Sequence, residues 1–447
     1  MERAVVKTRK NATSVAVVGA AVSGLCAAKY RLAERAAKFP SEEYFKVTVF
    51  EQADQAGGIW NQTSADDRFA TPMYPACNTN VPRTMMQYAG VNYPARTPLF
   101  PRNTVVKTYL QTCVRELEAR NLVRYNSEVT LVKYHTKDYN KKWQVTVRST
   151  VTGKTEETHW DAVVVALGTF GRPDIPPMYR LSEDFLITIM HSKSYRDAEV
   201  FRGKRVLVVG GGPSYWDLAK EISGVSRGEV LVSVRSPSPL QLSSANQRQV
   251  SPVRSIDAGS PRVRFTSGPP ARIDIILLCT GYTYHFDMIP CIQTTDDKKR
   301  GLNLIRRRPP PRPPSRARSR LAPPVAEAQS ALIARYFSGR WSLSVPAMTA
   351  ARADAHGRAE VDGRASSQEY HALRYPAAAD YVDRVFGEHL HAESPAGMGT
   401  GLVPAFHSAH LHWVRPQVGR VRTTFLARAR KHEDGRFPHP REYSVGF

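Results

Sequence analysis

The chain has 447 residues, and 42% of them are hydrophobic. This length is too great for one ordinary hydrophobic core, so it predicts two or three packed domains. Its 63 Lys and Arg against 40 Asp and Glu give a net charge of +23, which would suit nucleic acid or an anionic membrane if the charge were concentrated. The excess is instead dispersed, apart from seven Arg and no acid in residues 301–323, so the composition favours phosphorylated cofactors and argues against a nucleic-acid partner.

The first predicted element is an apolar strand over Ser14–Val18, followed by a glycine turn at Gly19–Gly24 and an Ala-rich helix from Leu25 to about Lys38. A basic N-terminus before this apolar stretch imitates a secretory signal. The strand interpretation is favoured because a second strand, Val47–Glu51, follows at the spacing of a βαβ unit.

The same pattern starts again in mid-chain, at Val206–Val209 and the glycine turn Gly210–Tyr215. Two further apolar runs that end in glycine, at 161–168 and 273–281, are typical of buried parallel strands. The sequence therefore predicts an α/β fold with two Rossmann-like dinucleotide-binding domains, the second inserted into the first. The remaining expected elements are a helix at Thr104–Ala119, strands at Val129–Tyr134, Trp143–Arg148 and Val230–Val234, and helices at Ala326–Ser338 and Pro376–Leu390.

The predicted domain boundaries follow these patterns. Residues 302–324 are rich in Arg and Pro and suit neither a helix nor a central strand. Our hypothesis for the tract 306–324 within them is a shifted reading frame or a misjoined exon, and the alternative is a basic linker that binds acidic partners or SH3-like domains. The expected parts are 1–175, the first part of one dinucleotide domain; 176–285, the inserted domain; 286–301, a return to the first; 302–324, the aberrant segment; 325–390, the C-terminal part of the first domain; and 391–447, a basic tail.

The first glycine turn indicates a dinucleotide site, since its backbone N–H groups meet a pyrophosphate at a helix N-terminus. Gly19 and Gly24 occupy the outer glycine positions, and Ala21 replaces the middle one, where a methyl group should weaken the dinucleotide. Glu51 ends the second strand, where an acid binds a ribose with a free 2′-hydroxyl, as in FAD or NAD. The alternative for this segment is an ordinary structural turn.

The second glycine turn contains Gly210, Gly212 and Ser214, with Tyr215 in place of the third glycine. Arg235 ends the strand that follows, and a cation at this position suits the 2′-phosphate of NADPH. The alternative for Arg235 is a solvated arginine at a strand end.

Gly58 and Trp60 follow the first ribose acid in the run Gly57-Gly58-Ile59-Trp60. Adjacent glycines let the chain pass close to a flat cofactor, and the Trp ring can cover it. A glycine loop capped by a buried Trp is the alternative, and this motif by itself does not separate the two.

Taken together, these motifs resemble the flavin-containing monooxygenase family, of the fungal or soluble type. The resemblance covers roughly residues 14–300 and resumes over 325–390. The family fingerprint Phe-x-Gly-x-x-x-His-x-x-x-Tyr matches 185–195, with Ile187 in the glycine position. The other matching residues include Thr79-Asn80-Val81-Pro82-Arg83, Ala166-Leu167-Gly168 and Cys279-Thr280-Gly281-Tyr282.

The resemblance implies FAD and NADPH as cofactors, with Gly168, Thr280 and Gly281 in their sites and Asn80 as the active-site residue. NADPH would reduce FAD, O₂ would add at the flavin C4a position as a hydroperoxide, and a nucleophilic N or S atom of a small molecule would take the distal oxygen. The alternative for Asn80 is an Asn that stabilises a proline-rich turn. The alternative functions are ketone oxygenation of the Baeyer–Villiger kind and a catalytically impaired dinucleotide-binding protein.

Other site classes are not indicated. The five cysteines form no C-x-x-C pair, so neither a disulfide framework nor a metal site is expected, and a reducing, cytoplasmic location is favoured. Without an apolar run of about 20 residues, no transmembrane segment is expected. The sequence sets no oligomeric state, and a homo-oligomer is compatible with it.

Overall fold

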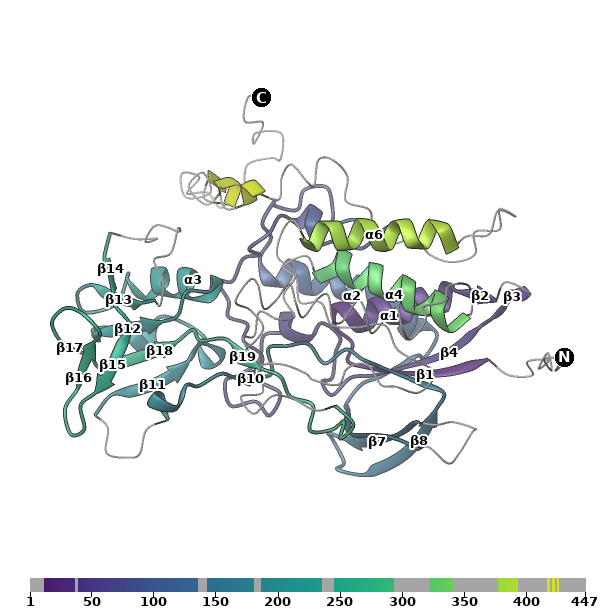
Figure 1. Cartoon of the computed structure of the whole chain (residues 1–447), viewed down its shortest axis with the longest axis horizontal. Helices are drawn as coiled ribbons and strands as arrows, with labels where there is room; N and C mark the ends of the chain where they lie inside the picture. The colour runs from purple at the N-terminus through teal and green to yellow at the C-terminus, as the bar shows by residue number, and fades with distance from the viewer. Residues whose placement is uncertain are drawn as a thin grey trace, which may run out of the picture. The chain divides into compact units, whose positions relative to one another are not determined.

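Two parallel sheets organise the computed structural model of the chain, one in each of two compact units (Figure 1). Unit 1 comprises residues 1–58, 81–168 and 286–447, and unit 2 comprises 59–80 and 169–285. The structure describes residues 12–36, 39–135, 143–180, 186–234, 245–292, 322–338, 340, 377–392, 416–418, 420–422 and 424–425.

The sheet of unit 1 has the strand order β5-β4-β1-β9, and all its pairs are parallel. Its central strand β1 (Thr13–Val18) is almost wholly buried, which confirms the predicted first strand. The partners are β4 (Phe45–Phe50), β5 (Val123–Arg124) and β9 (Ala162–Val165). Because the chain goes from β1 to β4 on one side and β9 lies on the other, the strand order reverses at the carboxyl ends of β1 and β9.

The longer helices among the described residues of unit 1 are α1 (Val22–Ala33), α2 (Asn103–Ala119), α4 (Ala322–Ser338) and α6 (Ala377–Ala392). The last three confirm helices predicted from the sequence. Helix α1 packs against α4, and α4 packs against α6, so that segments far apart in the chain lie side by side (Figure 1).

The predicted end of the first helix, at about Lys38, is wrong. Helix α1 ends at Ala33, and Glu34 is already extended, with φ −73° and ψ 133°. The Glu34 carboxylate accepts hydrogen bonds from Ser338 Oγ at 2.7 Å and from Arg340 at 3.1 Å. These partners lie some 300 residues away in the chain, so the local Ala-rich composition does not reveal them.

The remaining strands of unit 1 form antiparallel sheets. A turn at 151–154 joins β7 to β8, and Gly153 supplies its positive φ of 72°. Among the described residues, the 3-10 helix η2 (Arg83–Met85) also belongs to unit 1, and η1 (Gly58–Trp60) lies where the chain passes from unit 1 into unit 2. The strands are β2 (Arg35–Ala36) with β3 (Phe39–Glu43), and β6 (Ser127–Tyr134) with β7 (Trp143–Ser149) and β8 (Thr155–Trp160).

The sheet of unit 2 has the order β11-β18-β12-β13-β14, and all its pairs are parallel. Its strands are β11 (Thr188–His191), β12 (Val206–Val209), β13 (Val230–Ser233), β14 (Gln247–Val250) and β18 (Ile275–Leu278). The other elements are α3 (Pro213–Ile222), β10 (Arg172–Pro173), β15 (Val253–Ile256), β16 (Arg262–Phe265), β17 (Ala271–Arg272), β19 (Tyr282–Thr283), η3 (Pro177–Tyr179), η4 (Ser192–Ser194) and η5 (Glu199–Phe201).

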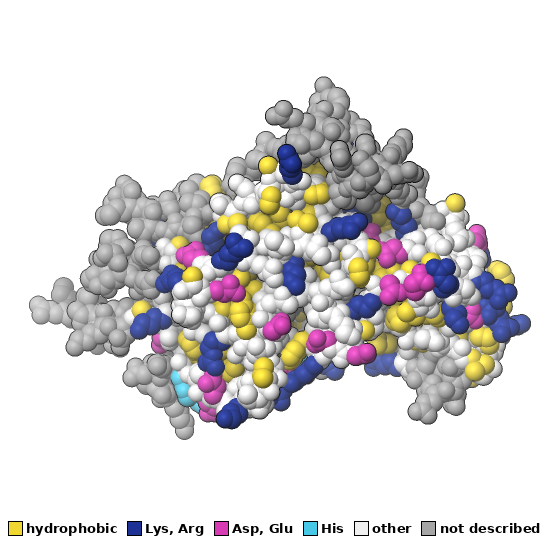
Figure 2. All heavy atoms as spheres, turned by 180° about the vertical axis from the view of Figure 1, so that it is seen from behind, with side chains coloured by type: hydrophobic (Ala, Val, Ile, Leu, Met, Phe, Trp, Pro, Cys, Tyr) yellow, Lys and Arg dark blue, Asp and Glu magenta, His cyan; other side chains and the backbone are white. Residues whose placement is uncertain are grey.

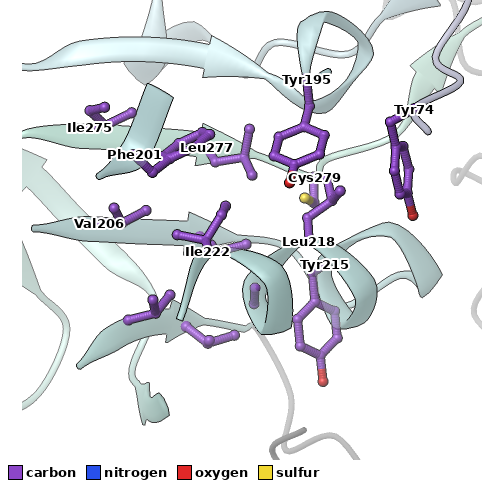
Figure 3. Packing of buried hydrophobic residues seen from close by; sticks show 14 of the residues in the cluster. Tyr74, Tyr195, Phe201, Val206, Tyr215, Leu218, Ile222, Ile275, Leu277 and Cys279 are labelled. Carbon is purple, nitrogen blue, oxygen red and sulfur yellow. The ribbon is translucent and has the colours of Figure 1, made fainter. Parts of the chain in front are cut away.

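Alternate residues of these strands bury opposite faces of the sheet, as the two-residue repeat of a strand requires. Val206 and Val208 face α3, whose Leu218 and Ile222 pack on them (Figure 3). Leu207 faces the other way, toward the small β15–β17 sheet. Because both faces are covered, the inner strands β12 and β18 are apolar throughout, which is the pattern seen in the sequence.

Several sequence predictions fall outside the described residues. They include the greater part of the Arg/Pro segment, residues 302–321, and much of the predicted basic tail after 391. The boundary between the units lies at Gly168, and the segment 59–80 joins unit 2. Sequence patterns predict the inserted domain over 176–285 and do not predict that 59–80 belongs with it.

Candidate functional site

The first glycine turn connects β1 to α1 with two glycines that tolerate no side chain. Gly19 has φ +105°, and a Cβ on it would lie 2.7 Å from the Ala166 carbonyl oxygen of the strand beside it. A Cβ on Gly24 would lie 1.8 Å from the Gly19 carbonyl oxygen. The helix therefore begins directly against the strand ends, where the strand order reverses, and α/β sheets bind ligands at such points.

The N-terminus of α1 is suited to an anion. Its N-cap residue is Ala21, which has no side-chain acceptor, and no acidic residue lies in the first helical turn. The first N–H groups of a helix have no partner within the helix, and the helix dipole adds positive potential there. No acidic side chain of the first turn neutralises this positive helix end, so it suits a pyrophosphate.

The methyl group of Ala21 lies against Gly58. A Cβ added to Gly58, whose φ is +55°, would come within 2.5 Å of Ala21 Cβ. Next to it, Gly57 N–H donates to the Ala20 carbonyl oxygen at 3.0 Å. Gly57 and Gly58 therefore pack directly on the first glycine turn, at Ala20 and Ala21. Ala21 is the residue that replaces the middle glycine of the motif.

Glu51 lies directly after β4, with its buried carboxylate beside the same turn. Its Oε2 accepts from Ala20 N–H at 2.7 Å, and its Oε1 accepts from Ala53 N–H at 3.0 Å. Burial raises the pKa of this carboxyl, and the backbone hydrogen bonds oppose that effect. Each carboxylate oxygen accepts more than one hydrogen bond, so a ribose hydroxyl can still donate to Glu51.

The other residues predicted for the flavin site are divided between the units. Gly168, with φ +71° and no atom within 4 Å of an added Cβ, follows β9 in unit 1. Gly58 ends the first stretch of unit 1, whereas Trp60 and Asn80 belong to the segment 59–80 of unit 2. Trp60 and Asn80 are both partly buried.

The second glycine turn repeats the arrangement in unit 2. Gly210 has φ +132°, and a Cβ on it would lie 2.3 Å from the Cys279 carbonyl oxygen at the end of β18. Gly212 is the N-cap of α3, which has no acid in its first turn. Ser214 is exposed, whereas Tyr215 is buried against the sheet (Figure 3). The turn lies where the order reverses between β12 and β18, so it also fits a dinucleotide.

Thr280 and Gly281 follow β18 at this edge of the sheet. Thr280 Oγ1 donates a hydrogen bond to the Asp174 carbonyl oxygen, and Asp174 N–H donates one to the Gly281 carbonyl oxygen at 2.9 Å. The backbone of this loop is therefore held by the segment that enters unit 2. Cofactor contacts for Thr280 and Gly281 remain a prediction.

His191, from the fingerprint motif, ends β11 and holds the same loop. Its Nδ1 accepts from Lys193 N–H at 3.1 Å, so its Nε2 carries the proton and donates to the Gly281 carbonyl oxygen at 3.0 Å. Burial lowers the His191 pKa to about 4, so the ring is neutral at pH 7. Ile187 of the same motif is buried in the core. Phe185 and Arg235 lie outside the described residues.

The sequence did not point to Arg196, which follows the fingerprint tyrosine. Its guanidinium donates to backbone carbonyl oxygens of the segment 59–80 and of its own loop. Its only sequence signal is its place beside Tyr195, because the carbonyl oxygens that it binds have no signature in a sequence.

The face of the molecule drawn in Figure 2 carries both positive and negative side chains. Lys and Arg side chains on the face in Figure 2 are interspersed with acidic ones among the described residues. In the part of the chain that the structure describes, no helix is long and apolar enough to cross a membrane.

Comparison with known proteins gives a family and a fold. Residues 12–247 match the family described as flavin-binding monooxygenase-like. The chain is 29% identical over 285 residues to a trimethylamine monooxygenase of Pelagibacter ubique, an alignment that covers 61% of this chain and 62% of that relative. It is 28% identical over 307 residues to the thiol-specific monooxygenase of Saccharomyces cerevisiae, covering 65% of this chain and 67% of that relative.

The similarity in fold to a solved structure covers almost the whole chain. The S-allyl-L-cysteine S-oxygenase of Allium sativum superposes with a TM-score of 0.74 over 97% of both chains, at 23% identity. The trimethylamine monooxygenase alignment, by contrast, spans less than two thirds of that relative's length. The fold with two dinucleotide-binding domains, predicted from the sequence, is confirmed.

Proposed function

The chain belongs to the flavin-binding monooxygenase-like family, and we propose that it is an FAD-dependent, NADPH- and O₂-using monooxygenase that oxygenates a nucleophilic N or S atom of a small molecule. The names of relatives support this chemistry, since one is a trimethylamine monooxygenase and another a thiol-specific monooxygenase. The proposal rests on one observation above all. A buried carboxylate, Glu51, lies beside a glycine turn whose helix end carries no side-chain acceptor.

We assign FAD to the first turn. Gly19, Ala21 and Gly24 would hold its pyrophosphate on the N-terminus of α1, and Glu51 would accept from the adenosine ribose. When bound, FAD supplies the redox chemistry, taking a hydride from NADPH and activating O₂. The protein binds and orients the partners and excludes water. The other residues proposed for the flavin side are Gly58, Trp60 and Gly168, with Asn80 as the active-site residue.

We assign NADPH to the second turn. Gly210, Gly212 and Ser214 would hold its pyrophosphate, and Thr280 with Gly281 would form the neighbouring wall of the site. Arg235, predicted from the sequence to bind the 2′-phosphate, gives a direct test of the preference for NADPH over NADH.

An absorbance spectrum tests the cofactor pair. The purified protein is expected to show flavin bands that bleach when NADPH is added without oxygen and return when oxygen is admitted. Formation of an amine oxide or sulfoxide from a model substrate would identify the oxygenase, and a lactone or ester from a ketone would instead indicate the Baeyer–Villiger reaction. A colourless protein that binds no added FAD would refute the proposal in favour of an impaired binding protein.

Substitution of Glu51 tests the assignment of the first turn. Glu51→Gln keeps the size of the side chain but removes the charge, and a hydrogen bond to a charged group contributes about 1.5–3 kcal/mol. The FAD dissociation constant is therefore expected to rise by about ten- to a hundredfold. The control is Glu116→Gln, the same change on the exposed face of α2. Unchanged FAD affinity in Glu51→Gln would contradict the ribose role.

A further inference from the structure

The segment 59–80 leaves unit 1 after Gly58 and returns to it at Val81, yet it belongs to unit 2. It begins beside Trp60 and ends at Asn80, the two residues of this segment that we propose for the flavin side. The contacts that attach it to unit 2 therefore determine where these two residues are held.

Arg196 makes the main polar attachment. The five N–H groups of its guanidinium have five backbone carbonyl oxygens as acceptors, at 2.7–3.1 Å. Three acceptors belong to the segment 59–80 and two to the loop that carries Arg196. They are Thr63, Ser64 and Thr71 from the segment, and Lys193 and Tyr195 from the loop.

The segment is closed on itself around this guanidinium. Thr71 Oγ1 donates to the Asn61 carbonyl oxygen, and Thr71 N–H donates to Thr63 Oγ1 at 2.9 Å. These two hydrogen bonds fix the backbone that presents three of the carbonyl oxygens to the guanidinium. Lysine has three donors on one atom and lacks this planar fork, so it cannot make the same set of bonds.

Tyr74 makes the apolar attachment. Its ring packs edge-on against Tyr195 with centroids 5.4 Å apart (Figure 3). Both rings belong to the core cluster that includes Tyr215 and Leu218 of α3. The helix that starts at the second glycine turn therefore shares its core with the segment 59–80.

We propose that Arg196 is a positioning residue, which fixes the segment 59–80 to the NADPH-binding unit so that nucleotide binding at the second glycine turn sets the placement of Trp60 and Asn80. This inference rests on the proposed function. A bound nucleotide stabilises α3 and the core that it shares with Tyr74, and the Arg196 hydrogen bonds transmit that stability to the backbone of the segment. No new bond is made or broken in the step.

Hydrogen exchange of the full-length protein tests the attachment without relying on turnover. In the wild type, NADP⁺ is expected to slow amide exchange in peptides over 210–222 and over 61–74. In Arg196→Lys, protection over 210–222 should remain, and protection over 61–74 should be lost. Arg202→Lys is the matched control, because Arg202 is exposed and pairs with Glu199 on the surface. It should behave as the wild type.

Kinetics give the second readout. Misplacement of a positioned group by about 1 Å can cost about a hundredfold in rate, so kcat of Arg196→Lys should fall at least about tenfold. KM for NADPH should stay within about twofold, since the glycine turn is untouched. If Arg196→Lys folds poorly, Thr71→Val is the second variant. It keeps Arg196 but removes the hydrogen bond from Thr71 Oγ1 to the Asn61 carbonyl oxygen, and it should also speed amide exchange over 61–74.

The outcomes separate the two proposals. Wild-type protein in which NADP⁺ protects neither region would overturn the proposed function and this inference with it. Protection over 210–222 without protection over 61–74 would leave the function intact and overturn the inference. So would an Arg196→Lys variant with wild-type exchange over 61–74 and wild-type kcat.

Discussion

Glu327 gives the sharpest prediction about stability. It lies on α4 and is fully buried, and its carboxylate accepts from Ala89 N–H at 2.9 Å and from Tyr30 Oη at 3.1 Å. Burial raises its pKa from 4.5 to about 7, against the opposing effects of these hydrogen bonds and of Lys29. Glu327→Gln keeps an acceptor oxygen for the same donors and removes the titration.

The sign follows from proton binding. Because the pKa in the folded protein exceeds that of the unfolded chain, the folded state holds more protons between pH 4.5 and about 7. The stability that Glu327 contributes is therefore fully present below pH 4.5 and is lost as the pH rises through about 7. The pKa difference of about 2.5, at 1.36 kcal/mol per pH unit, corresponds to a loss of about 3 kcal/mol.

Denaturant unfolding of the wild type and of Glu327→Gln, from about pH 5 to pH 8, measures this loss. The free energy of unfolding of the wild type should fall relative to the variant by about 2–3 kcal/mol over that range. Glu116→Gln, which changes an exposed carboxylate, should track the wild type at every pH. A gap between wild type and Glu327→Gln that does not change with pH, or that changes in the opposite sense, would refute the reasoning.

Two further predictions concern the first glycine turn. Gly24→Ala should abolish FAD binding and lower the unfolding midpoint, because its Cβ would lie 1.8 Å from the Gly19 carbonyl oxygen. The control is Gly171→Ala, which has open space around the added methyl group and should leave FAD binding and the unfolding midpoint unchanged. Gly58→Ala should lower FAD occupancy, since its Cβ would meet Ala21 Cβ at 2.5 Å, and adding Ala21→Gly should restore part of it. The FAD occupancy that is not restored reflects the φ of +55° at position 58, which disfavours alanine. If the double variant binds no more FAD than Gly58→Ala, the contact between the two methyl groups is not the cause of the loss.

The sequence by itself determined the elements whose cause is local. The apolar run of β1 and the glycines that follow it predict a buried strand and a turn against a helix, because no other residue type permits that approach. The position of Glu51 at the end of the next strand follows from the same repeat. The strand β12 and the second glycine turn were predictable for the same reason, and so was the order of the two dinucleotide folds along the chain.

Only the tertiary structure decided what depends on residues far apart in the chain. Helix α1 ends at Ala33 because Glu34 has partners near residue 340, which local helix propensity does not include. The methyl of Ala21 lies against Gly58, so its effect depends on a second turn. Arg196 binds backbone carbonyl oxygens, which every residue has. A sequence pattern specifies which side chains are present, but which backbone atoms meet them is set by the packing of the whole unit.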